Sequence, residues 1–544
     1  MPGTGIHAAE LILLLLLLFV VAFAALAQKL KTPYPIVLVI AGLLLGFVPH
    51  IPKITLNPEL VFLVILPPLL YSAAWLTSWQ DFCYNLVSIV SLAIGLVAFT
   101  VLGVAATASW LFKGFDWRIG FVLGAVVATT DAIAATSIAK RVGLPKRIVD
   151  ILEGESLVND ATGLLALEFA IAIVVYGQPP TISSAALRLA YLIIAGIAVG
   201  LILGRIVEWF EHRINDAPIE IAVSIFVPYT AYLAGEAIRG SGVLAVVAAG
   251  LYLGHRSSRF FSPGVRLQAN AVWESLVFIL NGVVFVVIGL QLPYVLRQTE
   301  GVPISNLLLY GGLFSSLVIV LRLLWTFPGA RVSFFVRTRL LHQKEKRPGT
   351  RELFVVGWTG MRGVVALAAA LSLPQTLADG SLFPHRNLIV FLTFSVILVT
   401  LVLQGVTLPP LIRALGLGGG SGPHTQETEA RRAVLEAGLH YLENRRQSDQ
   451  LAFADLYDDL AQHYQHRLAG LTGDSNDVDG SEQERYARYL DLSRELLDTE
   501  RQTALRLRDE GRIGDGVLRE LEHELDLSEA RLNAATTNRA RKLQ

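Results

Sequence analysis

The sequence predicts an all-α polytopic membrane protein with about thirteen transmembrane helices, followed by a helical tail. Of its 544 residues, 53% are hydrophobic and only 17% are charged, whereas an ordinary soluble domain has roughly 25% charged residues. The mean hydropathy is +0.54, and apolar runs of about twenty residues, the length that crosses a bilayer, recur along the chain. This composition excludes a disordered chain and a typical soluble enzyme, and the single cysteine, Cys83, excludes an intrachain disulfide scaffold.

The candidate spans cover most of the chain before residue 415. We interpret the first as a retained span rather than a signal sequence, because no Lys or Arg precedes it and many apolar runs follow. The ninth span is short, and the fifth, sixth and twelfth carry unusual polar residues. The thirteen spans lie near residues 9–28, 34–50, 58–77, 85–112, 117–140, 149–176, 185–210, 217–237, 241–254, 268–295, 305–328, 352–374 and 387–414.

Basic residues are unevenly distributed between the two sets of short loops. One set of alternate loops holds about 17 Lys and Arg residues, and the other set holds about 7. Loops rich in Lys and Arg stay on the cytoplasmic side of a membrane. We therefore expect a multi-pass protein of the cell membrane, with its N-terminus outside and its C-terminal tail in the cytoplasm.

The composition changes sharply after the last span. We expect a transmembrane domain over residues 1–415, a Gly-rich linker over 416–425 and a cytoplasmic helical regulatory tail over 426–544. Residues 421–544 hold 25 of the 45 acidic and 17 of the 45 basic residues, so this part is net negative and the membrane part is net positive. Leucines at helical spacing predict amphipathic helices over 426–470 and 481–535.

The acidic stretch at 473–480, between these two helical segments, resembles a calcium-binding loop in composition only. It lacks the twelve-residue ligand spacing with a terminal Glu. We expect it to be a solvated connector.

Five charged residues fall inside predicted spans: Asp131, Glu155, Asp160, Arg322 and Arg362. A charge near the bilayer centre costs at least about 2.5–3.5 kcal/mol on insertion scales. Such residues are retained when they pair with one another or take part in transport. They are therefore the first candidates for a functional site.

The fifth span is interrupted in its middle by Thr129, Thr130 and Asp131. Their side chains compete for backbone groups and weaken a helix. Non-helical backbone at this depth is tolerated only where it is buried or lines a cavity. Freed carbonyls there would suit a monovalent cation, while a threonine that only caps a buried turn is the alternative reading.

The sixth span carries Glu155, Ser156, Asn159 and Asp160 within a turn and a half. Ser156 and Asp160 share one face, and Glu155 and Asn159 share the adjacent face. A carboxylate beside a hydroxyl and an amide oxygen is a plausible ligand set for sodium or lithium. A protonated carboxylate no longer attracts a cation, so such a group binds either a proton or a cation, which is the basis of antiport.

The twelfth span contains three glycines within residues 357–363, which loosen the helix beside Arg362. The guanidinium of Arg362 keeps its proton and needs a counter-charge, and Glu155 is the partner that we expect, in a structural ion pair. Arg322 is a weaker candidate that would also fit a snorkelling residue near the membrane edge. Glu236 is another weaker candidate, near a possible span end.

The two interrupted spans occupy matching positions if the seventh span is a connector between two halves of six. Paired discontinuous helices in matching positions point to a transporter site, and an odd number of intervening spans makes the halves inverted repeats. We therefore expect two inverted six-helix repeats with interrupted crossing helices.

These residues also carry a family resemblance over residues 10–415. The chain resembles the monovalent cation/proton antiporter family that includes the sodium/proton exchangers, in its bacterial branch. Weaker matches are Glu236 with Ser241-Gly-Val243, and Asn281 with Ile288-Gly-Leu290. The principal matching segments are Leu66-Pro-Pro-Leu-Leu-Tyr71, Thr130-Asp131, Gly154-Glu-Ser-Leu-Val-Asn-Asp160 and Gly360-Met-Arg-Gly-Val-Val365.

The resemblance implies a homodimer in membrane lipid whose core moves in an elevator-like cycle. It implies that Asp160 binds the proton and the cation in turn, with Thr130, Ser156 and Asp131 completing a sodium site. Asn159 is a neutral partner where electrogenic relatives place a second Asp. One titrating carboxylate then predicts electroneutral one-for-one exchange of Na+, Li+ or K+ for H+.

One departure from the family pattern leaves the cation open. Many relatives have an acidic residue near position 72, where this chain has Ser72, so potassium/proton exchange is an alternative. A passive cation channel, an intramembrane enzyme and a transporter-shaped sensor are further alternatives. We expect no enzyme activity, no cofactor and no nucleic-acid partner, because phosphate-binding, metalloprotease and DNA-binding signatures are missing from the sequence.

Overall fold

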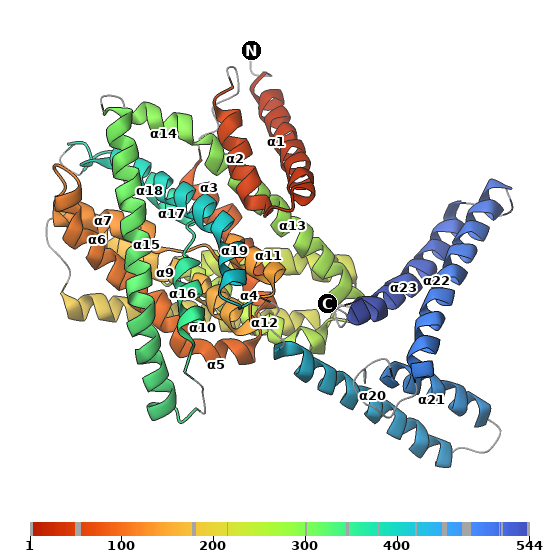
Figure 1. Cartoon of the computed structure of the whole chain (residues 1–544). Coiled ribbons are helices and arrows are strands. Elements are labelled where there is room, and N and C mark those ends of the chain that lie inside the picture. The colour runs from red at the N-terminus through yellow and green to blue at the C-terminus, as the bar shows by residue number, and fades with distance from the viewer. Residues whose placement is uncertain are drawn as a thin grey trace. The chain divides into compact units, whose positions relative to one another are not determined.

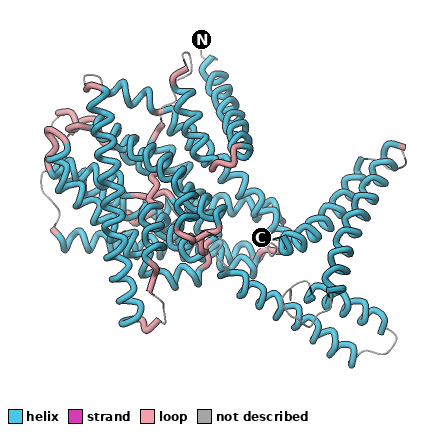
Figure 2. The backbone as a smooth tube through the Cα atoms, viewed as in Figure 1, coloured by secondary structure: helices cyan, strands magenta, loops and turns pink. Residues whose placement is uncertain are grey.

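The computed structural model is built from helices joined by short loops (Figures 1 and 2). The residues that it describes contain no strand, only one isolated bridge between Thr376 and Leu382. They form two compact units, Met1–Gly420 and Ser421–Gln544. The described residues are 4–48, 56–176, 181–214, 216–299, 302–343, 347–377, 380–418, 422–448, 454–469, 480–510, 512 and 515–540.

The helices of the first unit follow the predicted apolar runs closely. Four short π-helical segments occur: η1, η2 and η4 continue directly into the α-helix that follows, and η3 forms the end of the helix that begins with α15. In chain order the elements are α1 (Thr4–Lys29), α2 (Tyr34–Gly46), α3 (Pro58–Leu60), η1 (Val61–Ile65), α4 (Leu66–Leu76), α5 (Trp79–Val90), η2 (Ser91–Leu96), α6 (Val97–Leu111), α7 (Trp117–Ala128), α8 (Ala132–Val142), α9 (Lys146–Tyr176), α10 (Ile182–Glu211), α11 (Ala217–Ala237), α12 (Gly242–Phe260), α13 (Pro263–Leu290), α14 (Leu292–Gln298), α15 (Ile304–Phe335), η3 (Val336–Leu340), α16 (Thr350–Trp358), α17 (Val364–Leu371), α18 (Arg386–Val399), η4 (Thr400–Gln404) and α19 (Gly405–Ala414).

The all-α polytopic prediction is confirmed, but the number of thirteen spans is not. Eight helices among the described residues are long and apolar enough to cross a membrane, and the bent pair α7 and α8 makes nine. The pair α7 and α8 is bent by 41° at its break. The predicted twelfth span is likewise divided, into α16 and α17, and the first two spans contribute only shorter apolar helices. The inverted-repeat symmetry stays a prediction.

The breaks have local causes in the sequence. Asp116 caps α7 by accepting a hydrogen bond from the Ile119 amide at 2.9 Å, and Asp131 caps α8 in the same way. α8 ends at Val142, and the next residue, Gly143, has a φ of +75°, a left-handed conformation that glycine adopts without steric cost.

Two large clusters of buried apolar side chains hold the membrane unit together. In the first, α2 packs along α13, and α4 and α10 pack on α12. In the second, α6 packs along α7, and α15 packs on α18. The α7–α8 break lies where α9 and α17 also approach, so both interrupted helices meet inside the unit. Figure 1 shows α17 and α18 in cyan behind the long green α15.

The described residues of the second unit form four helices, two in each of the predicted helical segments. α20 packs on α21 and α22 packs on α23, with ion pairs such as Arg446–Asp458 at 2.7 Å and Arg501–Asp526 at 2.6 Å. The acidic stretch at 473–480, except for its last residue, and residues 419–421 of the predicted linker lie outside the described residues. The helices are α20 (Gly422–Ser448), α21 (Ala454–Ala469), α22 (Gly480–Asp509) and α23 (Asp515–Ala540).

Candidate functional site

The two interrupted helices cross with their backbones in direct contact. Between α7 and α8 the chain is extended at Thr129 and Asp131, and between α16 and α17 it is extended at Gly363. The amide of Asp131 donates a hydrogen bond to the carbonyl of Met361 at 2.9 Å. This bond ties one break to the other, which satisfies backbone groups that would otherwise be unpaired inside the membrane.

Arg362 caps the C-terminal end of α7. Its Nη1 donates to the carbonyl oxygens of Ala128 at 2.8 Å and of Thr129 at 2.9 Å. The backbone amide of Arg362 donates to the hydroxyl of Thr400 at 3.1 Å. A buried cation at a helix C-terminus is stabilised by the free carbonyls and by the helix dipole. Nε and Nη2 of Arg362 have no hydrogen-bond partner among the described residues.

The predicted ion pair between Glu155 and Arg362 is wrong. Glu155 instead pairs with Arg322 of α15 in a bidentate arrangement, with Nη1–Oε1 at 2.5 Å and Nη2–Oε2 at 2.8 Å. Both residues are 1% exposed, so Arg322 is not a snorkelling residue at the membrane edge. The guanidinium of Arg322 also donates to the carbonyl of Val356 in α16.

The reason for this pairing lies in Gly360. A Cβ atom at that position would overlap the side chain of Arg322, so the missing side chain opens the route by which Arg322 reaches Glu155. Arg362, by contrast, is directed toward the α7 carbonyls. One arginine therefore neutralises a carboxylate, and the other stabilises a helix end.

The polar face of α9 holds the broken segment in place. Ser156 donates to the carbonyl of Thr130 at 2.9 Å, and the hydroxyl of Thr130 donates to Glu155 Oε1 at 3.0 Å. Asn159 Nδ2 donates to the same Thr130 hydroxyl at 2.5 Å. Asn159 Oδ1 is buried and has no partner among the described residues. It is an acceptor oxygen that a cation or a water molecule can use.

The two aspartates of the site lie within electrostatic reach of each other. Asp131 Oδ1 accepts a hydrogen bond from the amide of Ile133 at 2.8 Å, and its carboxylate rests against Gly363, where a Cβ atom would overlap it. Asp160 is 5% exposed, and no hydrogen bond joins its carboxylate to another described residue. Both oxygens of this carboxylate are therefore available to bind a proton or a cation.

The ionised side chains at the crossing are one positive charge short of neutrality. Arg322 and Arg362 contribute two positive charges, and Glu155, Asp131 and Asp160 contribute three negative charges when all are ionised. A net buried charge is strongly unfavourable at low dielectric. One proton or one monovalent cation makes this cluster neutral.

The sequence missed a tyrosine that faces the site. Tyr34, in the first turn of α2, lies against Asn281 of α13 and within electrostatic reach of Asp131. It brings a hydroxyl from helices that pack on each other outside the crossing. The only sequence signal is a polar aromatic residue at the start of an apolar run, and that is too common to point to a site.

The structure brings together all of the predicted site residues except one. Thr129 contributes its carbonyl to Arg362, whereas Glu236 is exposed at the end of α11 and accepts a hydrogen bond from the Gly242 amide at 3.1 Å. Among the described residues no group of three or more His, Cys, Asp or Glu side chains is arranged to hold a metal ion. The oxygens that remain, two carboxylates with hydroxyl, amide and carbonyl groups, are typical ligands of hard cations.

Comparison with known proteins gives one consistent family. Residues 14–414 match the family described as "Sodium/hydrogen exchanger, transmembrane". A protein of Mycobacterium tuberculosis described as an uncharacterized Na(+)/H(+) exchanger is 34% identical over 539 residues, which cover 97% of each chain. The sodium, potassium, lithium and rubidium/H(+) antiporter of Bacillus subtilis is 34% identical over 415 residues, 74% of this chain and 61% of that protein.

A solved structure shares the fold. The sodium proton antiporter MjNhaP1 from Methanocaldococcus jannaschii matches with a TM-score of 0.57 and 21% sequence identity, over 76% of this chain and 99% of that chain. These matches confirm the family resemblance that the sequence motifs indicate.

Proposed function

Because the chain belongs to the sodium/hydrogen exchanger family and exchanges monovalent cations for protons across a membrane, we propose that Asp160 binds the two ions in turn. The carboxylate of Asp160 is buried beside the crossing and makes no hydrogen bond to a described residue. Protonation removes the charge that attracts the cation, and a bound cation opposes protonation. The two ions therefore compete for one group, and neither crosses while the other is bound.

The proposed cation site consists of Asp160, Asp131, Thr130 and Ser156, with Asn159 as a neutral neighbour. The hydroxyls of Thr130 and Ser156 are fixed by hydrogen bonds to Glu155 and to the Thr130 carbonyl. Fixed oxygens reduce the entropy that ordering the ligands costs when an ion binds. The absence of a carboxylate at Ser72 favours no particular cation. We propose Na+ as the substrate, with Li+ and K+ as the ions to compare.

The charge balance at the crossing is the observation that carries this proposal. The cluster is neutral when it holds one proton or one monovalent cation. It carries a net charge when it holds both or neither. Moving the occupied site across the membrane costs least when the buried cluster is neutral. This supports electroneutral one-for-one exchange.

We extend the proposal to the setting of the transporter. The protein is a homodimer of the cell membrane, with the N-terminus outside and the tail in the cytoplasm, and the crossing moves as part of a core in an elevator-type cycle. The uneven distribution of Lys and Arg between loops supports the orientation.

Proton flux in proteoliposomes tests the proposal. Purified full-length protein is reconstituted, and Na+, Li+ or K+ is added in turn while an internal dye reports pH. We expect cation-driven proton flux in the wild type, its loss in Asp160→Asn, and normal flux in the control Glu236→Gln, which removes an exposed carboxylate of the same unit. Because proton and cation compete, acidification should raise the apparent KM for Na+ by up to about tenfold per pH unit.

Three results would contradict parts of the proposal. Flux that persists in a folded Asp160→Asn protein would move the carrier role to Asp131. A flux that changes with an imposed membrane potential would exclude electroneutral exchange. A steady cation leak without proton movement would indicate a channel.

A further inference from the structure

A pair of buried carboxylates lies on helices that take no part in the crossing. Glu211 is the last residue of α10 and Glu220 lies in the first turn of α11, and they are 2% and 3% exposed. The two carboxylates are within electrostatic reach of each other, so each makes the negative charge of the other more costly. Glu211 also lies at the negative end of the α10 dipole, where a negative charge is unfavourable.

The basic side chains around α10 are used by a different carboxylate. Arg205 of α10 and Arg256 of α12 pair with Glu208 at 3.0 Å and 3.1 Å. Glu208 lies one turn before Glu211 on α10. Among the described residues no Lys or Arg pairs with Glu211 or Glu220. Two negative charges are therefore buried without a compensating charge from the protein, which is strongly unfavourable unless a ligand supplies it.

Three oxygen atoms at this pair have a hydrogen-bonding capacity that the protein does not use. The Oε2 atoms of Glu211 and Glu220 and the hydroxyl of Tyr71 are buried and have no partner among the described residues. Tyr71 comes from α4, is 1% exposed and lies within electrostatic reach of Glu211. Buried polar atoms are rarely left without a partner, so these oxygens indicate a ligand that the chain itself does not provide.

An aromatic cluster holds Tyr71 beside the pair. The ring centroid of Tyr71 lies 5.2 Å from that of Trp273 in α13 and 5.8 Å from that of Trp75 in α4. The indole N–H of Trp273 donates to the hydroxyl of Ser224 at 3.0 Å. Ser224 lies one turn after Glu220, on the same face of α11. The oxygens are thus held on packed helices, which reduces the entropy that ordering them around an ion costs.

The charge and the atom types of this place decide which ligand fits. Carboxylate and hydroxyl oxygens suit hard cations, and Mg2+ is commonly held by one or two carboxylates with water in the remaining positions. A divalent cation balances the two negative charges, whereas a monovalent cation leaves one of them. Asp216, which is also within reach of Glu220, is exposed, so water screens its charge.

We propose that Glu211, Glu220 and Tyr71 bind a hard divalent cation, Mg2+ or Ca2+, where α10 ends and α11 begins. Such an ion joins α4, α10 and α11, which pack around α12 (Figure 1). Because it binds the folded protein, it raises the stability of the membrane unit.

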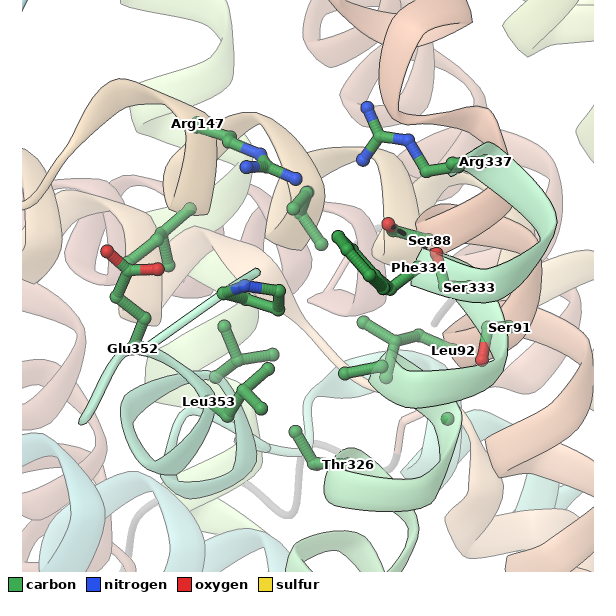
Figure 3. A pocket seen from close by; sticks show the side chains of 16 residues that line it. Ser88, Ser91, Leu92, Arg147, Thr326, Ser333, Phe334, Arg337, Glu352 and Leu353 are labelled. Carbon is green, nitrogen blue, oxygen red and sulfur yellow. Dashed lines mark hydrogen bonds between the residues drawn. The ribbon is translucent and has the colours of Figure 1, made fainter. Parts of the chain in front are cut away.

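This place is distinct from the cavity that lies beside the crossing. That cavity has a volume of about 70 Å³ and is lined by residues such as Ser88, Thr326 and Leu353 (Figure 3). None of its lining residues belongs to α4, α10 or α11. Asp131 and Asp160 also lie outside these three helices. A substitution in the acidic pair therefore changes no side chain of the cavity or of the crossing.

The test uses full-length protein in a neutral detergent, freed of metal ions with EDTA and kept in choline chloride. Mg2+, Ca2+ or Na+ replaces part of the choline at constant ionic strength, and the melting temperature is recorded. Electron paramagnetic resonance measures bound Mn2+, which prefers the same oxygen ligands. The variants are Glu211→Gln, Glu220→Gln and Tyr71→Phe. Glu274→Gln is the matched control, because Glu274 is an exposed carboxylate of α13 beside Trp273.

We expect Mg2+ or Ca2+ to stabilise the wild type and Glu274→Gln and to displace bound Mn2+ from both. Either variant of the pair should bind the divalent ion at least about tenfold more weakly, since even the loss of an outer partner of a metal ligand costs roughly 10–100-fold in affinity. Without added metal, both variants should melt at or above the wild-type temperature, because the repulsion between the carboxylates is gone. Tyr71→Phe should keep its stability without metal and lose part of the response to divalent ions.

Three results would overturn the proposal. The first is an equal response of the wild type, Glu211→Gln and Glu220→Gln to divalent ions. The second is equal stabilisation of the wild type by Na+, which would indicate a monovalent ion. The third is no response of the wild type to any metal, which would indicate that a proton occupies the pair. Glu220→Gln keeps the test valid if Glu211→Gln does not fold, and none of these readouts requires transport, so they are independent of the role given to Asp160.

Discussion

Removing the carboxylate of Glu155 should destabilise the protein more than any other conservative change of a single charge in the membrane unit. Glu155→Gln keeps the shape of the side chain and an acceptor for the Thr130 hydroxyl. It leaves Arg322 without its counter-charge, at a position where both partners are 1% exposed. Breaking a buried pair on one side costs about 3–5 kcal/mol, because the other charge stays buried and unpaired.

The assay compares thermal unfolding of purified variants in one detergent. We expect Glu155→Gln to lower the melting temperature by several degrees, as roughly 3–5 kcal/mol implies for a large domain. Glu168→Gln is the control, because Glu168 makes an exposed pair with Arg188 at 3.5 Å, and exposed pairs contribute about 0–1 kcal/mol.

A double variant distinguishes the loss of the ion pair between Glu155 and Arg322 from a loss of side-chain packing. Arg322→Met combined with Glu155→Gln removes both charges and keeps the apolar stem that passes Gly360, so much of the lost stability should return. The reasoning is refuted if Glu155→Gln is as stable as the control. It is also refuted if the double variant loses the sum of the two single effects.

Three further predictions follow from the same geometry. Gly363→Ala should displace the Asp131 carboxylate that rests on Gly363 and raise the KM for Na+ about tenfold. Gly264→Ala is the control, because Gly264 has open space around it and its substitution should leave the KM unchanged. Cation-dependent proton flux measures the KM of both variants. Tyr71→Phe should melt at or above the wild-type temperature, because its buried hydroxyl has no partner among the described residues and losing an unsatisfied group is nearly neutral or stabilising. Asn159→Asp adds a buried negative charge, so transport should become sensitive to an imposed membrane potential; unchanged potential dependence would count against the charge balance.

The sequence predicted which buried charged residues the structure brings together at the crossing, because the cost of charge in lipid is local and large. Asp131, Glu155 and Asp160 stand out against apolar surroundings, and the helix-weakening residues around Asp131 mark a true break between α7 and α8. These signals need no knowledge of the tertiary structure. The number of spans was less predictable, because a break divides an apolar run into helices that are each too short to cross alone.

The sequence could not predict which arginine pairs with Glu155. Glu155 had two buried arginines as possible partners, and both are in fact near it. Which one forms the pair depends on the directions in which their side chains point, and these are set by the approach of α15 to the break between α16 and α17. Tyr34 was missed for the same reason, since α2 gives no local sign that it faces Asp131.

The motif Gly360-Met-Arg-Gly363 correctly predicts that a helix is interrupted here, but the sequence does not show why glycine is needed at both positions. Its glycines were interpreted as residues that loosen a helix, and the helix does end there. In the structure each glycine also admits a side chain from elsewhere, Arg322 at Gly360 and Asp131 at Gly363. The same two glycines therefore place a positive charge beside Glu155 and the negative charge of Asp131 in the proposed cation site. Alanine at either position would keep much of the loosened backbone and still disturb the charges. Weaker cation-dependent transport in both variants, without loss of folding, would therefore separate the two roles.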